Sequence, residues 1–89
     1  MNEHILKRIK EINTEIYEAV EKLRMTKAAY DELVNLHDVI TSKDDYDQKK
    51  ADEIVGRAQK YFDENTSIQL TLREKEAALA ELQSLLEEE

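Results

Sequence analysis

Cysteine, proline and tryptophan are missing from this 89-residue sequence, and glycine occurs once. Without cysteine, the chain cannot form a disulfide, a thiolate metal site or a cysteine nucleophile. Without proline and with one glycine, it has too few turn residues for a sheet protein, and a glycine-rich phosphate loop is excluded. No apolar run approaches the roughly 20 residues of a membrane-spanning helix. What remains is a chain suited to long helices.

Negative charge predominates, with a formal net charge of -8. Nucleic acids and anionic membranes are bound by basic patches, so neither is expected as a direct partner. The excess is unevenly spread, because residues 1–24 hold five basic and five acidic side chains whereas residues 51–89 hold four and ten. The second half of the chain is therefore its acidic part.

The beginning of the sequence has no apolar stretch followed by a small-residue cleavage site, and it carries charge from Glu3 onward. No signal peptide is therefore predicted. We expect a soluble, cytoplasmic protein, with export by a route that needs no cleaved signal as the alternative.

The composition, 38% charged and 40% hydrophobic, is typical of long helices and coiled coils. Over residues 3–40, apolar side chains recur at alternating spacings of four and three, which places them on one stripe of a helix. Asn2 is expected to cap this helix. The stripe consists of Ile9, Ile16, Leu23, Tyr30 and His37 at one heptad position and Ile5, Ile12, Ala19, Thr26, Leu33 and Ile40 at the other.

A reversal is predicted at residues 41–46, the densest cluster of cap and turn residues. Ser42, Asp44 and Asp45 can each cap the next helix, and Asp45 with Gln48 has the spacing of a capping box. The repeat resumes over residues 46–86, and so short a loop makes the helices antiparallel. The second stripe consists of Ala51, Ala58, Asn65, Leu72, Leu79 and Leu86, and of Ile54, Tyr61, Ile68, Lys75 and Leu82.

The predicted fold is therefore all-α, a single domain over residues 1–89 built as a long antiparallel helical hairpin that resembles a coiled coil. One alternative stays open. The triplet from Asn65 to Ser67 is unfavourable in a helix, and Thr66 with Gln69 has capping-box spacing, so a break there would give three helices. The unbroken phase of the stripe favours the continuous second helix.

Folding back at residues 41–46 brings Leu33 near Ile54. Midway along the hairpin it brings polar residues onto the stripe, with Thr26 near Tyr61 and Leu23 near Asn65. Such polar layers commonly fix register or oligomeric state and cost stability. The two ends of the hairpin are therefore expected to pack better than its middle.

Further apolar residues widen both stripes beyond what two helices can cover. Wide stripes are typical of bundles, so assembly into a four-helix bundle is expected, and a docking face for another protein is the alternative. Two tyrosines fall off the stripes, and tyrosine is enriched at interfaces. The predicted partner-binding residues are Leu6, Tyr17, Val20, Val34, Leu36, Tyr46, Val55 and Phe62.

No residue pattern typical of catalysis or metal binding is present. The Glu-x-x-His pairs of helical di-metal sites are missing, since Val34 stands three residues before His37. Asp44, Asp45 and Asp47 lack the glycine and the glutamate of a calcium loop. We predict no catalytic, cofactor-binding or metal-ligating residue, and the chain is not expected to be an enzyme.

In length, acidity and uninterrupted helical hairpin, the whole chain resembles the small partner proteins of type VII secretion systems. The Trp-x-Gly turn of that family is absent, because the sequence has no tryptophan. A Tyr-x-x-x-Glu spacing occurs as Tyr17 and Glu21, in the first predicted helix rather than near the C-terminus. The resemblance is architectural and implies a helical partner of a secreted protein.

Two functions follow from these patterns. The first is a non-catalytic helical interaction module of the adaptor, small-chaperone or secretion-partner type, which binds itself or a larger protein through its apolar flank. The alternative is a small acidic inhibitor, for example a phage-encoded one, that blocks a basic nucleic-acid-binding surface on its target.

Overall fold

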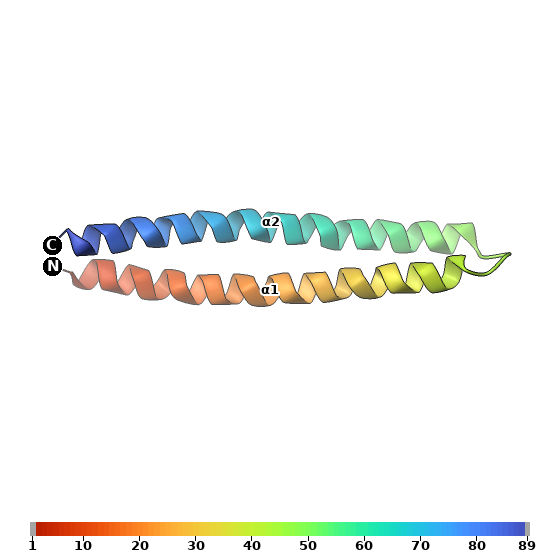
Figure 1. Cartoon of the computed structure of the whole chain (residues 1–89), viewed down its shortest axis with the longest axis horizontal. Coiled ribbons are helices and arrows are strands. Elements are labelled where there is room, and N and C mark those ends of the chain that lie inside the picture. The colour runs from red at the N-terminus through yellow and green to blue at the C-terminus, as the bar shows by residue number, and fades with distance from the viewer. Residues whose placement is uncertain (1, 89) are drawn as a thin grey trace.

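The computed structural model describes residues 2–88 and shows two long helices. Helix α1 spans Glu3–Thr41 and helix α2 spans Gln48–Glu87. The helices lie side by side and antiparallel, so that the start of α1 and the end of α2 meet at one end of a rod (Figure 1). The rod measures 68 × 14 × 14 Å. The predicted all-α hairpin is confirmed.

Burial follows the two predicted stripes. Every residue assigned to either stripe is buried or half-buried. Within α2, Ala78 is the only half-buried residue that does not belong to the predicted stripe. Because the stripes repeat every seven residues, they stay aligned along the full length of both helices. The most buried residues are Ile12, Ala19, Thr26 and Leu33 in α1, and Ala51, Ile54 and Ala58 in α2.

A buried apolar cluster lies at the turn end of the rod. Leu33, Ile54 and Ala58 form a buried cluster there, against which Tyr30, Ile40 and Tyr61 pack. From residue 59 to residue 88, α2 has no fully buried side chain. In the free half the deepest burial is on α1, where Ile12 is 2% exposed. At the turn end Ala51 and Ala58 are buried, and the half-buried rings of Tyr30 and Tyr61 pack against the cluster.

Helix α2 begins later than expected, and its cap is Asp47 rather than Ser42, Asp44 or Asp45. Asp47 has an extended backbone (φ -76°, ψ 107°), and its carboxylate accepts hydrogen bonds from the backbone N–H groups of Lys49 and Lys50 at 3.0 and 3.3 Å. Two of the four free N–H groups of the first turn are thereby paired. The predicted capping box does not form, since Gln48 donates instead to Asp52.

The expected cap at the start of α1 does not form either. Asn2 has a helical backbone (φ -78°, ψ -7°), and its side chain makes no capping hydrogen bond. The backbone carbonyl of Asn2 instead accepts from Leu6 N–H at 2.9 Å, so the residue behaves as part of the first helical turn.

Helix α2 runs unbroken through the triplet from Asn65 to Ser67, which excludes the three-helix alternative for the described residues. The Thr66 hydroxyl donates to the carbonyl of Phe62 at 3.0 Å, a bond that keeps this residue inside the helix. The side-chain amide of Gln69 donates to Asn65 Oδ1 at 2.7 Å, so Gln69 does not serve as a capping partner of Thr66.

The polar layer midway along the rod is a cross-link between the helices. Asn65 Nδ2 donates to the Leu23 carbonyl at 3.1 Å and to Thr26 Oγ1 at 2.8 Å. Thr26 Oγ1 in turn lies 2.9 Å from the Lys22 carbonyl, to which it donates. No buried side-chain nitrogen or oxygen among residues 2–88 lacks a hydrogen-bond partner. The layer thus fixes the alignment of α1 against α2 at a position where apolar packing alone would tolerate sliding.

Candidate interaction surfaces

One side of the rod carries an exposed apolar surface built from both helices. Val34 of α1 and Val55 of α2 line a single groove together with Tyr30, His37 and Ala58. One turn beyond Ala58 along α2, the ring of Phe62 lies 6.1 Å from the ring of Tyr30 at an angle of 49°. Val55 and Phe62 remain 51% and 53% exposed. We refer to Val34, Val55 and Phe62 as the valine face.

A second apolar surface lies on α1 alone. Met25, Leu36 and Val39 are 65%, 44% and 61% exposed. With Ala29 and Glu32 they follow the same alternation of four and three residues as the buried stripe, so they lie in one row along the helix. We refer to Met25, Leu36 and Val39 as the methionine face. Sequence reasoning missed Met25 and Val39, although their 14-residue separation was a visible sign of a second row.

The structure separates Leu36 from Val34, with which it was grouped in the sequence. Two residues along a helix correspond to a rotation of about 200°, so the two side chains leave α1 on opposite sides. Val34 shares a groove with Val55, whereas Leu36 shares one with Arg57 and Tyr61. Leu36 therefore belongs to the methionine face.

The remaining predicted partner-binding residues are exposed but not gathered together. Leu6, Val20 and Val34 lie in one row, yet successive members are 14 residues, or about 21 Å, apart. Tyr17 is exposed one turn before Val20, and Tyr46 is exposed in the turn at the tip of the rod. Of the eight predicted residues, only Val34, Val55 and Phe62 belong to one surface, in which the ring of Tyr30 connects Phe62 to the groove of the two valines.

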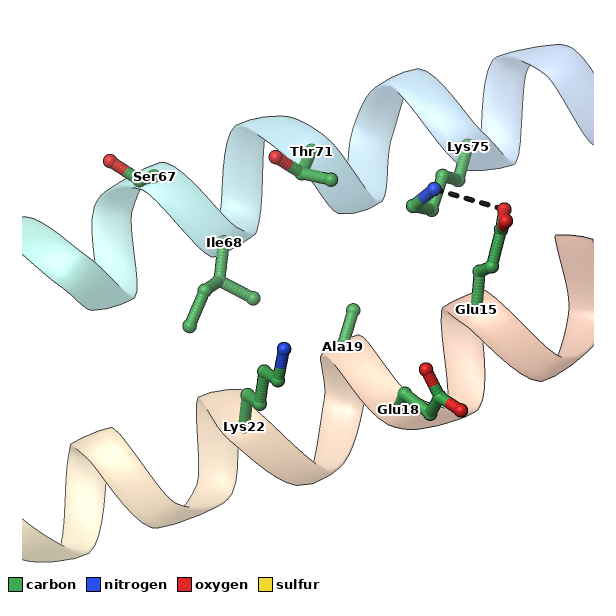
Figure 2. A pocket seen from close by; sticks show the side chains of 8 residues that line it. All are labelled: Glu15, Glu18, Ala19, Lys22, Ser67, Ile68, Thr71 and Lys75. Carbon is green, nitrogen blue, oxygen red and sulfur yellow. Dashed lines mark hydrogen bonds and ion pairs between the residues drawn. The ribbon is translucent and has the colours of Figure 1, made fainter.

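A polar groove crosses the rod in its free half (Figure 2). Small side chains, Ala19 and Thr71 among them, leave a volume of about 330 Å³ between the helices, and Ile68 points from α2 toward α1 beside it. Lys75 occupies a stripe position where an apolar residue would be expected. Its ammonium Nζ lies 3.0 Å from Glu15 Oε2, which pairs the charge at the edge of the groove.

The hydrogen bond from Lys75 lowers the pKa of Glu15 below its ordinary value, aided by the positive charges of Lys75 and Arg8 and opposed by partial desolvation. A carboxyl whose folded pKa is depressed contributes stability above its ordinary pKa and loses that contribution as the pH falls through the folded value. We expect Lys75→Gln to return the Glu15 pKa toward that of an unpaired glutamate. An NMR titration of the Glu15 side-chain carboxyl measures this, and an unchanged pKa would show that the ion pair does not persist in solution.

Within residues 2–88, no three His, Asp or Glu side chains come together as metal ligands would. Neither α1 nor α2 contains a stretch long and apolar enough to cross a membrane.

The fold and these surfaces define a class, the antiparallel two-helix coiled coils with apolar surface left outside the seam. Comparisons with known protein families, with curated proteins and with solved structures find no match to this chain.

Proposed function

We propose that this chain is a non-catalytic helical interaction module, which associates with a second copy of itself or with a larger protein through the valine face. The observation that carries the proposal is that Val34, Val55 and Phe62 form one continuous exposed surface across both helices. Isolated exposed apolar residues are ordinary, but a contiguous patch drawn from two helices is typical of an interface.

The overall surface area supports the proposal. The chain exposes 7052 Å², whereas a compact monomer of its mass would expose about 5,400 Å². The excess of about 1,700 Å² is comparable to the area that one partner buries in an obligate interface. Two helices side by side cannot enclose all of their apolar residues, because each helix covers only the stripe of the other that faces it.

The aromatic members of this side suit an interface as well. Phe62 and Tyr30 present a large, rigid apolar area at low cost in side-chain entropy, and such residues dominate the energetics of protein contacts. Self-association by this side would place four helices around a shared core, which is the four-helix bundle expected from the width of the stripes. A helical segment of a larger protein would cover the same surface as one additional helix.

The test is the paired substitution Val34→Glu and Val55→Glu. Two carboxylates in the centre of a desolvated interface leave charges unpaired, so we expect association to weaken at least a hundredfold. Solution mass by light scattering, together with recovery of any stoichiometric companion from the native host, measures association. Helix content by circular dichroism should stay unchanged, because neither valine belongs to the buried stripe.

The matched control is Leu70→Glu. Leu70 is 55% exposed on the outer side of α2, away from both faces, so the same kind of charge should leave association intact. If the double valine variant kept its mass and its companion, the proposal would fail. If binding were lost at moderate salt but did not change with the valine substitutions, the acidic second half of the chain would be the binding surface instead.

A further inference from the structure

The heptad repeat continues through the turn without a change of phase. His37, Asp44 and Ala51 are spaced by seven residues, and so are Ile40, Asp47 and Ile54. A single pair of heptad positions therefore runs from Ile5 to Leu86. Asp44 and Asp47 are the only two members of this series that lie in the loop connecting α1 to α2.

A hairpin does not require this continuity. The loop lets the chain rotate freely between the helices, so any loop length with suitable backbone angles can aim the α2 stripe at α1. Preserved phase does matter for one other structure, a single continuous helix whose stripe lies along one side from end to end.

The turn itself contains no feature that forbids a helix. It has neither glycine nor proline, and no described residue has a positive φ. Ser42 already has helical backbone angles (φ -72°, ψ -11°), and Asp47 departs from them mainly in ψ, which is 107°. Since φ is negative at every described residue, the segment can become helical at the modest cost of the weak helix propensities of serine, tyrosine and aspartate.

We propose that this chain has a second state, in which it forms one continuous helix and pairs antiparallel with a second copy of itself. Each contact between α1 and α2 is then made between chains instead of within one, and each is made twice around a two-fold axis at the former turn. This is an exchange of identical elements, which needs no new interface. It uses the buried stripe and leaves the valine face exposed, so it is independent of the proposed function.

Asp44 and Asp47 determine which state prevails. The alignment that pairs Thr26 with Asn65 would place Asp44 of one copy against Asp47 of the other, twice, at the centre of the dimer. Four carboxylates would then share a position meant for apolar residues, where like charges repel. In the hairpin, Asp47 instead caps α2, and the six-residue loop gives the helices an effective concentration in the millimolar range. The hairpin is favoured for both reasons.

The test is the double variant Asp44→Leu and Asp47→Leu in the full chain. These two substitutions make the apolar stripe continuous through the turn. We expect a mass of two chains and a maximum dimension near 130 Å, the length of about 85 residues of helix, against 68 Å for the hairpin. Light scattering gives the mass and small-angle X-ray scattering gives the dimension. A variant that keeps a dimension near 70 Å, whatever its mass, overturns the proposal, because a side-by-side bundle of hairpins has that length.

The matched control is Ser42→Leu with Asp45→Leu. These positions lie in the same turn but fall on the outer side of a continuous helix, so this variant should keep the dimensions of the wild type. An extended dimer in the control would also overturn the proposal, since the heptad positions would then have no special role.

A pair of deletions tests the phase directly. Removing Thr41–Asp47 takes out seven residues and preserves the phase, whereas removing residues 42–47 takes out six and rotates one half of the stripe by about 100°. Neither chain retains a loop, so each must pair as a continuous helix. We expect the seven-residue deletion to form the long dimer and to melt about 10 °C or more above the six-residue deletion. Equal melting temperatures would contradict the proposal.

Discussion

Replacing Ile54 with alanine is expected to lower the free energy of unfolding by about 3 kcal/mol, the middle of the range for such truncations in a packed core. Ile54 is 5% exposed and belongs to the cluster with Leu33 and Ala58. The loss combines the transfer energy of three carbon atoms with the cavity left behind. A domain of this length has about 4–13 kcal/mol of stability in total. One substitution would therefore remove a large share of it.

Urea unfolding followed by circular dichroism measures the change, and Leu70→Ala is its control. Leu70 sits in the same helix but is 55% exposed, and alanine is as good a helix former as leucine, so the control should shift stability by less than about 0.5 kcal/mol. Equal effects of the two substitutions would show that Ile54 is not packed in a buried cluster.

Replacing Asn65 with aspartate is expected to cost about 2 kcal/mol, although the side chain keeps its shape. The amide of Asn65 donates to the carbonyl of Leu23 and to Thr26 Oγ1. A carboxylate has no proton to donate, so its oxygen would face the carbonyl oxygen across a half-buried gap. The Thr26 hydroxyl can turn to donate to the new carboxylate, which recovers only part of the loss.

The same variant should show a diagnostic pH dependence. A carboxyl forced against a carbonyl oxygen binds its proton more tightly in the folded state, so its pKa is raised relative to the unfolded chain. The deficit is then fully present above the folded pKa and shrinks as the pH falls through it, because the protonated acid regains a donor. Thermal melts at neutral and acidic pH measure this. Asn35→Asp, the same change at an exposed position of α1, should cost little at either pH.

The sequence predicted the seam almost residue by residue, because seven-residue spacing depends only on the geometry of a helix. It failed at both N-caps. Asp47 was not among the three predicted caps, Ser42, Asp44 and Asp45, since capping depends on which residue takes an extended backbone, and the local sequence does not determine that. The sequence analysis also grouped Leu36 with Val34. The two residues are close in sequence, but they lie on opposite sides of α1, because two residues along a helix correspond to a rotation of about 200°.

By itself, the sequence determined that the chain is helical, that it reverses once, and which residues lie between the helices. These properties come from local propensity and periodicity, which every stretch of the chain carries independently. Only the tertiary structure decided that Asn65 bonds to Thr26 and the Leu23 carbonyl, that Leu33, Ile54 and Ala58 form a buried cluster beside the turn, and that Val34, Val55 and Phe62 form one surface. Those properties depend on how far one helix is displaced along the other, and that displacement is set by side chains distant in sequence meeting in space.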